Sequence, residues 1–195
     1  MKVFVVYCHP STNSFTHNVY ENFVLGLEDA GHEIMISDLY EMNFQTDLSK
    51  EEYLRESFYR ADVSVAEDVK IEQEKIQNSD AIVFIYPVFW TEAPAKLVGW
   101  FDRVWSTGFA YNPKPQMKVL DKALVIACAG KSMETLTVTG EKAAMETVML
   151  GDRIRNRAKA KQMIIFDNIT HMNEELREKM MPEHIEKAYR LGRDF

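Results

Sequence analysis

Residues 9–16 of the sequence form a segment that could bind a phosphate group. His9–Thr16 reads HPSTNSFT and is dense in hydroxyl and amide side chains, and no Asp or Glu occurs between His9 and Tyr20. Helices commonly place an acid in their first turn, where it complements the positive end of the helix dipole. Unpaired N–H groups without a competing carboxylate suit a phosphate. We therefore predict an anion site here, and the alternative is an ordinary helix cap formed by Ser or Asn.

A second segment carries aromatic side chains at a place where ligands commonly bind. Pro87–Ala93 reads PVFWTEA and follows the apolar run Ala81–Tyr86, which is typical of a strand buried on both faces. We expect the strand to stop at Pro87, because proline lacks the N–H that the ladder needs. In open parallel sheets, ligands bind on loops at the carboxyl ends of strands. The aromatic residues Phe89 and Trp90 therefore indicate a flat, partly apolar ligand, and plain core packing is the alternative for Trp90.

The elements that would position these segments are strands alternating with helices. Five apolar runs predict strands at Lys2–Tyr7, His32–Asp38, Ala81–Tyr86, Lys122–Ala127 and Gln162–Phe166. Helices are expected from Phe15 to about Asp29, over Ala66–Gln77, from Pro94 onward, over about Glu141–Lys159 and over Asn173–Arg190. Tyr40–Val65 has no clean period, so we expect an excursion there with one short helix near Glu51–Ser57.

This alternation predicts an α/β fold with a parallel sheet and helices on both faces. Five strands at this spacing fit the flavodoxin-like order 2-1-3-4-5 better than the longer dinucleotide-binding fold. We expect residues 1–195 to form a single domain of this kind, with the excursion at about 40–65 inserted before the helix that precedes strand three. The cleft should lie above strands one and three, which the two segments described above follow.

Composition and motifs exclude several other classes. The formal charge of −7 argues against nucleic-acid binding, which needs a basic face. The longest apolar run is about ten residues, too short to cross a bilayer, and no signal peptide is evident. Neither GxGxxG nor GxxxxGK[ST] occurs. The five histidines do not cluster, so no metal site is expected. We read Cys8 and Cys128 as buried small residues in a cytoplasmic protein, too far apart for a disulfide.

Three motifs together resemble the NAD(P)H:quinone oxidoreductases of the flavodoxin-like superfamily. They are CHPSTNSFT after the first strand, YPVFWTEAPAKLVGWFDRVWSTGFAY after the third, and ACAGKSM after the fourth. The middle motif, with P-x-x-W followed by P-A-x-L-x-G-W-F-[DE]-R-V and G-F-A-Y, is the most specific of the three. The resemblance runs from the N-terminus to about residue 134 and becomes thinner beyond it.

The resemblance implies a flavin cofactor, FAD or FMN, with NAD(P)H as hydride donor. Its phosphate side would contact His9, Asn13, Ser14, Phe15 and Thr16. The edge of its ring would lie against Pro87, Val88, Phe89, Trp90 and Thr91, and its pyrimidine side against Ala127, Cys128, Ala129 and Gly130. Backbone N–H groups after a strand could stabilise the negative charge of a reduced flavin. Trp90 and Tyr111 would face the substrate, the latter commonly across a dimer interface in the family.

The implied function is two-electron reduction of quinones or similar flat acceptors by NAD(P)H. Donor and acceptor would use one slot in turn, which gives ping-pong kinetics. Two alternatives are a flavodoxin-type electron carrier and a regulatory flavoprotein subunit of a potassium-efflux system. The chain departs from the family pattern at one place, because Glu134 and about Gly140 stand where better-known members carry a Tyr–His pair.

A homodimer is also expected. Trp100, Phe101, Val104 and Trp105 give the helix after Pro94 an apolar surface that looks wide for one sheet face to cover. A second copy of the chain could cover the remainder of this surface.

Overall fold

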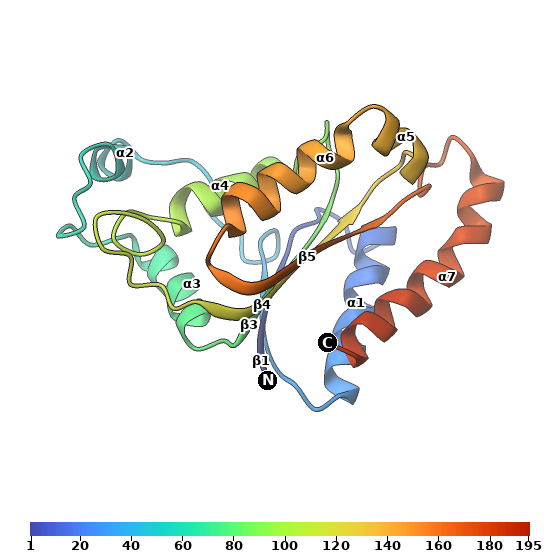
Figure 1. Ribbon diagram of the computed structural model, residues 1–195, viewed down its shortest axis with the longest axis horizontal. Helices are drawn as coiled ribbons and strands as arrows, with labels where there is room; N and C mark the ends of the chain where they lie inside the picture. Colours follow the sequence, from blue (N-terminus) through green and yellow to red (C-terminus); the bar gives the residue numbers. More distant parts are fainter.

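One parallel sheet runs through the centre of the computed structural model, which describes residues 1–195 (Figure 1). Its strands are β1 (Lys2–Tyr7), β2 (Glu33–Asp38), β3 (Ala81–Pro87), β4 (Leu120–Cys128) and β5 (Ala158–Phe166). They lie in the order β2-β1-β3-β4-β5, and every neighbouring pair is parallel. The predicted fold class and strand order are therefore confirmed.

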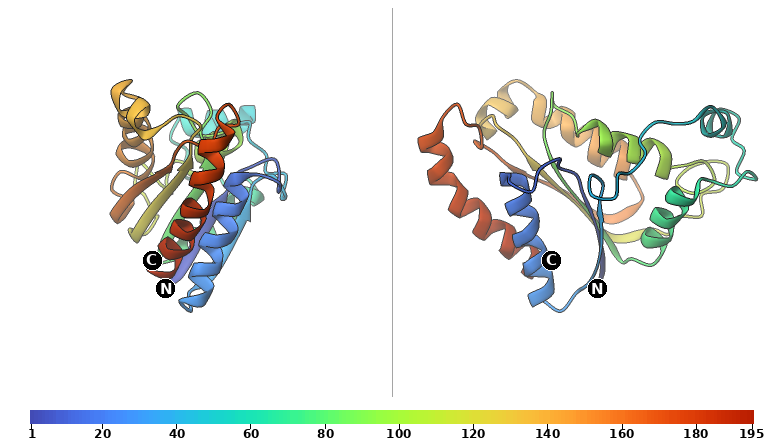
Figure 2. Two further views of the ribbon diagram at one scale, coloured as in Figure 1. Left: turned by 90° about the vertical axis from the view of Figure 1, so that its right-hand side faces the viewer. Right: turned by 180° about the vertical axis from the view of Figure 1, so that it is seen from behind.

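Helices cover both faces of the sheet. They are α1 (Phe15–Asp29), α2 (Lys50–Ser57), α3 (Glu67–Gln77), α4 (Ala95–Val104), α5 (Met133–Val138), α6 (Glu141–Glu146), the π-helix η1 (Thr147–Ile154) and α7 (Glu174–Arg193). α1 and α7 pack side by side on one face, and α3, α4 and η1 cover the other (Figure 2). No helix combines the length and the apolar character that crossing a bilayer requires.

The strand sequences explain why two layers of helix form. Successive side chains of a strand point to opposite faces, and in β1 Phe4 and Val6 join the core under α3 and α4, whereas Val3 and Val5 join the core under α1. Every residue of β3 is buried. An all-apolar strand of this kind is stable only when both of its faces are covered.

Glycines bring the backbones of α1 and α7 into direct contact. A Cβ atom on Gly192 would lie 2.1 Å from the carbonyl oxygen of Phe23, and one on Gly26 would lie 2.1 Å from that of Tyr189. Only glycine allows helices to approach this closely. The contact fixes α1, whose N-terminus follows β1 at the carboxyl edge of the sheet.

The excursion between β2 and α3 is anchored by two buried arginines. Arg103 of α4 donates to Glu52 of α2, to Asp68 of α3 and to the carbonyl oxygen of Gln45. Arg55 donates to the carbonyl oxygens of Val63 and Thr107. The hydrogen bond from Arg103 holds the pKa of Asp68 below its usual value. These contacts explain how a segment without clean hydrophobic periodicity folds against the sheet.

Several boundaries differ from the prediction, three of them with a clear physical reason. β3 includes Pro87 as its last residue, where the missing N–H removes only one ladder bond. The helix expected over Glu141–Lys159 ends at Ile154, because the chain reverses at Arg155, which adopts a φ of 48°. The strand expected from Gln162 instead begins at Ala158, and its polar first half lies at the sheet edge.

We expect Gly192→Ala to lower the free energy of unfolding by about 1–3 kcal/mol, because the added methyl group must push α1 and α7 apart. Gly151→Ala is the matched control, since it adds the same group to a helical position with nothing within 4 Å. Because alanine lowers the conformational entropy of the unfolded chain, this variant should have an unchanged or higher free energy of unfolding. Urea denaturation followed by circular dichroism measures both. Equal stability of the two variants would contradict the close helix contact.

Candidate functional site

The candidate site is formed by three loops at the carboxyl edge of the sheet. Residues 8–14 follow β1, residues 88–94 follow β3, and residues 129–132 follow β4. These strands are neighbours, so their loops emerge side by side (Figure 1). β1 and β3 flank the point at which the strand order reverses, where doubly wound sheets bind ligands.

The first loop presents several backbone N–H groups without an acceptor. Ser14 caps α1 by accepting from the N–H of His17, and the first turn of the helix contains no acid. The N–H groups of Thr12, Ser14, Phe15 and Thr16 donate to no protein atom. Such a cluster at a helix N-terminus is the arrangement that binds phosphate, so the structure retains the feature on which the prediction rests.

The side chains of the first loop contribute unequally. Phe15 and Thr16 are buried, so they can offer a ligand only their backbone. Ser11 and Asn13 are exposed. Nδ1 of His9 lies 3.0 Å from the nitrogen and 2.9 Å from the oxygen of Ser11, which leaves Nε2 without a protein partner. Burial lowers the pKa of His9, and Nε2 is the ring nitrogen left available to a ligand.

The second loop is a tight, strained hairpin. The N–H of Phe89 donates to the oxygen of Glu92 at 2.8 Å, and the reverse bond is 2.9 Å. Trp90 and Thr91 between them have φ values of 51° and 66°, as in a type I′ turn, which normally takes Asn-Gly. Each such residue costs about 1–3 kcal/mol and persists where the surroundings enforce it. The N–H groups of Trp90 and Thr91 have no acceptor.

Large apolar side chains are exposed around these loops. Trp90 is 99% exposed and Phe89 is half exposed, whereas Trp100 is fully buried. Val138 lies in α5 after β4, and Met172 lies after β5 and is 96% exposed. Sequence reasoning singled out Trp90 but missed Val138 and Met172, because neither stands in a pattern that separates it from core residues. Exposed apolar groups beside free N–H donors suit a ligand with a flat ring and polar edges.

The third loop begins later in the chain than predicted, and this changes which backbone N–H groups a ligand could reach. Ala127 and Cys128 belong to β4, and the N–H of Ala129 donates to the oxygen of Phe166. The strand continues further than its apolar run suggested, so Ala127 and Cys128 lie in the sheet rather than in the loop. The contact of Ala127–Gly130 with the pyrimidine side of a flavin stays a prediction. The free N–H groups are those of Gly130, Lys131 and Ser132, and the last two were not predicted.

The two cysteines near the site are inert, as predicted. Burial raises the pKa of both Cys8 and Cys128 to about 12, and both are free thiols. β3 lies between their strands. Neither thiol can form a thiolate at neutral pH or bond to the other.

Tyr111 does not join the three loops within one chain. The hairpin precedes α4 and Tyr111 follows it. The ten residues of this helix separate the two by about 15 Å along its axis. The hydroxyl group of Tyr111 donates to Glu56 at 2.6 Å, and the ring of Tyr59 packs against it edge-on. Burial, followed by the hydrogen bond to Glu56, raises the pKa of Tyr111.

Two other expectations change in physical detail. Trp100, Phe101 and Val104 are already buried within one chain, so the reason given for a homodimer on α4 is wrong, although the dimer itself stays a prediction.

Glu134 lies in the first turn of α5, after the cap residue Ser132, which is an ordinary place for a helix acid.

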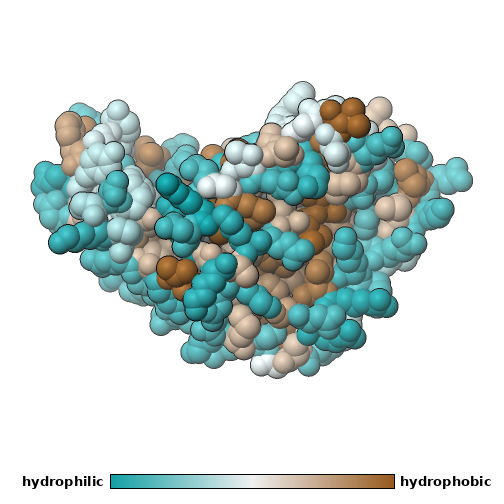
Figure 3. All heavy atoms as spheres, viewed as in Figure 1, coloured by the Kyte–Doolittle hydropathy of each residue, from teal (hydrophilic) through white to brown (hydrophobic).

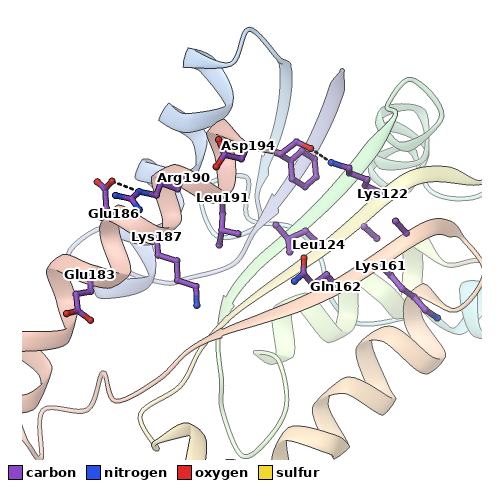
Figure 4. A pocket seen from close by; sticks show the side chains of 13 residues that line it. Lys122, Leu124, Lys161, Gln162, Glu183, Glu186, Lys187, Arg190, Leu191 and Asp194 are labelled. Atoms are coloured by element: carbon purple, nitrogen blue, oxygen red, sulfur yellow. Dashed lines mark hydrogen bonds and ion pairs between the residues drawn. The ribbon is translucent and has the colours of Figure 1, made fainter.

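A cavity of about 730 Å³ lies elsewhere (Figure 4). It opens between β4, β5 and the second half of α7, away from the carboxyl edge, and α7 residues such as Lys187 and Glu183 form its rim. The three-loop site lies instead at the carboxyl edge of the sheet. On the face drawn in Figure 3, hydrophobic side chains (brown) gather near the centre between hydrophilic ones (teal).

A doubly wound parallel sheet with free N–H donors at its switch point is the arrangement of a nucleotide-binding α/β protein. Comparison with known proteins specifies the class further. A model of the flavodoxin-like fold matches residues 1–153. The solved structure of the NAD(P)H:quinone oxidoreductase from Methanothermobacter marburgensis is similar to this chain, with 42% sequence identity and a TM-score of 0.91. The match covers 100% of this chain and 95% of that protein's chain.

Curated relatives match a shorter part of the chain. NAD(P)H dehydrogenase [quinone] 1 from Rattus norvegicus is 35% identical in an alignment of 124 residues, and the match covers 57% of this chain and 45% of that protein. Ribosyldihydronicotinamide dehydrogenase [quinone] from Pongo abelii is 34% identical in an alignment of 126 residues, and the match covers 57% of this chain and 54% of that protein. The chain spans about half the length of these relatives. It belongs to the flavodoxin-like family and, within it, to the NAD(P)H:quinone oxidoreductases.

We expect Asn13→Asp to weaken FMN binding about tenfold, because a carboxylate would then stand beside the phosphate in a loop that has none. Asn156→Asp, in an exposed turn between η1 and β5, makes the same change in charge away from the site and should bind as the unaltered protein does. Quenching of FMN fluorescence measures the dissociation constants. Undiminished binding by the first variant would mean that the phosphate lies elsewhere.

Proposed function

We propose that this protein is a flavin-dependent oxidoreductase that passes two electrons from NAD(P)H to quinones or similar flat acceptors. The observation that carries the proposal is the set of unpaired N–H groups on three adjacent loops beside the exposed Trp90. The full-length similarity to an NAD(P)H:quinone oxidoreductase supports the same activity.

The donor set fits a flavin. The N–H groups of Thr12, Ser14, Phe15 and Thr16 would hold its phosphate, and the hairpin donors would bind the polar edge of its ring. When bound, the flavin would supply the hydride-transfer chemistry. FMN and FAD share the groups that these residues would contact, and the mass of the released cofactor distinguishes them.

The third loop compensates for the missing Tyr–His pair in this proposal. Tyrosine and histidine have side chains that donate hydrogen bonds. The ionised side chain of Glu134 only accepts them, and Gly140 has no side chain. Gly130, Lys131 and Ser132 offer backbone N–H groups instead, and fixed donors of this kind stabilise negative charge without reorganising. Trp90 and Phe89 would hold a flat acceptor by stacking and keep water from it.

A homodimer would bring Tyr111 to a substrate. Tyr111 lies too far from its own hairpin, and the neighbouring side chains of Phe58 and Tyr59 are exposed by 69% and 57%. We infer that this aromatic surface, rather than α4, meets a second copy of the chain and completes the partner's site. Exposed aromatic groups of this kind are enriched in subunit contacts.

The first test is the absorbance spectrum of the purified protein before and after anaerobic addition of NADH or NADPH. We expect flavin bands near roughly 370 and 450 nm that bleach in one phase, with the faster reductant naming the donor. Initial rates at several acceptor concentrations should then give parallel lines, since donor and acceptor use one slot in turn.

Other outcomes assign the protein differently. Bands that do not bleach, or that bleach in two separate steps, would favour an electron carrier or a regulatory subunit. A protein that neither contains nor takes up flavin would overturn the proposed function altogether.

Mixing two weakened variants tests the role of Tyr111. If Tyr111 acts on the partner's site, subunits carrying Tyr111→Ala and subunits carrying Trp90→Ala should restore about a quarter of the intact sites after exchange, because half the dimers are mixed and each holds one complete site. Quinone reduction by the mixture measures this. Activity equal to the mean of the separate variants would place Tyr111 outside the partner's site.

A further inference from the structure

An ion pair joins the hairpin of the second loop to η1. Nη1 of Arg153 donates to Oε1 of Glu92 at 2.8 Å, and Nη2 lies 3.4 Å from Oε2. The same Oε1 accepts from the N–H of Ala93 at 2.7 Å. The carboxylate of Glu92 therefore ties the end of the hairpin both to a distant helix and to the residue that leads into α4.

Arg153 is itself held firmly. Its guanidinium carbon lies 4.8 Å from the centre of the Phe101 ring, and its backbone oxygen accepts from the indole N–H of Trp105. Nη1 also lies 3.2 Å from the sulfur of Met149. The side chain of Arg153 is 13% exposed, against 40% for Glu92. The arginine is thus a fixed point of η1 that packs against α4, and the glutamate is the more exposed partner.

The tip of the hairpin has few other supports. Trp90 is exposed to 99%, and the turn is closed by only the two backbone bonds between Phe89 and Glu92. Two consecutive non-glycine residues with positive φ would relax if nothing enforced the turn. The bond from Arg153 ties the side chain of Glu92 to η1, and the bond from Ala93 ties it to the residue that follows in the chain.

We propose that Arg153 is a positioning residue that acts through Glu92 to hold the Phe89–Glu92 hairpin, so that the N–H groups of Trp90 and Thr91 face the flavin. The inference rests on the proposed function, because a flavin is what these two donors would bind. Arg153 need not touch the cofactor for this. The pair preorganises a binding loop, which lowers the ordering that binding would otherwise require.

A direct electrostatic effect predicts the opposite result for one variant. If charge alone mattered, Glu92→Gln would remove a negative charge near an anionic cofactor and tighten its binding. If positioning matters, the same substitution weakens binding, because a neutral amide forms a weaker bond to Arg153 than a carboxylate does. The amide oxygen can still accept from Ala93, so the start of α4 is preserved.

The experiment measures FMN affinity for Glu92→Gln, Arg153→Gln and the double variant. We expect each single variant to bind about tenfold more weakly, and the double variant to bind about as weakly as either, because both remove one interaction. Arg155→Gln is the control. It removes a positive charge two residues from Arg153, and the side chain of Arg155 is exposed and forms no ion pair. The FMN affinity of this variant should match that of the unaltered protein.

Hydrogen exchange in the flavin-free proteins supplies a second measurement. The N–H groups of Phe89 and Glu92 should exchange faster in the Glu92 and Arg153 variants than in the unaltered protein or the Arg155 control. If the unaltered protein binds no flavin, the proposed function is overturned. Faster exchange in the Glu92 and Arg153 variants would still show that the ion pair holds the hairpin. Tighter FMN binding by Glu92→Gln, additive losses in the double variant, or unchanged exchange would each overturn the positioning role. Glu92→Gln alters a partly exposed residue, so the test does not depend on whether Arg153→Gln folds.

Discussion

β3 is buried on both faces along its whole length, and the rest of the molecule is arranged to achieve this. α1 and α7 must cover one side and α3, α4 and η1 the other. A strand that pairs with a neighbour on each side, as β3 does, leaves its backbone polar groups free only at its ends. The carboxyl ends of β1, β3 and β4 consequently meet at one edge, and the backbone N–H groups there have no strand or helix left to bond.

These free donors come mostly from backbone rather than from ionisable side chains. The site contains no acid in its first loop and no available thiol, and burial lowers the pKa of His9. In the function that we propose, such a surface would recognise phosphate and the polar edge of a ring by dipoles whose directions are fixed when the chain folds. Its chemistry therefore depends on the backbone conformation of each loop, which makes the strained turn at Trp90 and Thr91 more important than their side-chain types suggest.

The sequence was sufficient for the sheet and for two of the loops. Apolar runs marked each strand, and Ser14 and the absence of acids marked the N-terminus of α1. The sequence was insufficient where the decisive feature is a backbone angle or a distant contact. Nothing local shows that Arg155 adopts a positive φ, that β4 continues through Cys128, or that Ser132 starts a helix. The pairing of Glu92 with Arg153 and of Tyr111 with Glu56 joins residues far apart along the chain, which periodicity cannot reveal.

The glycine contact between α1 and α7 bears on the order in which the protein can be assembled. The apolar face of α1 packs against a helix from the opposite end of the sequence, and interactions between such distant segments form late because a long loop must close first. During synthesis on the ribosome, α1 would therefore lack its neighbour until residues 174–193 had emerged. The N-terminus of α1, where we propose that a phosphate binds, would acquire its final position only then, so cofactor capture would follow translation of α7.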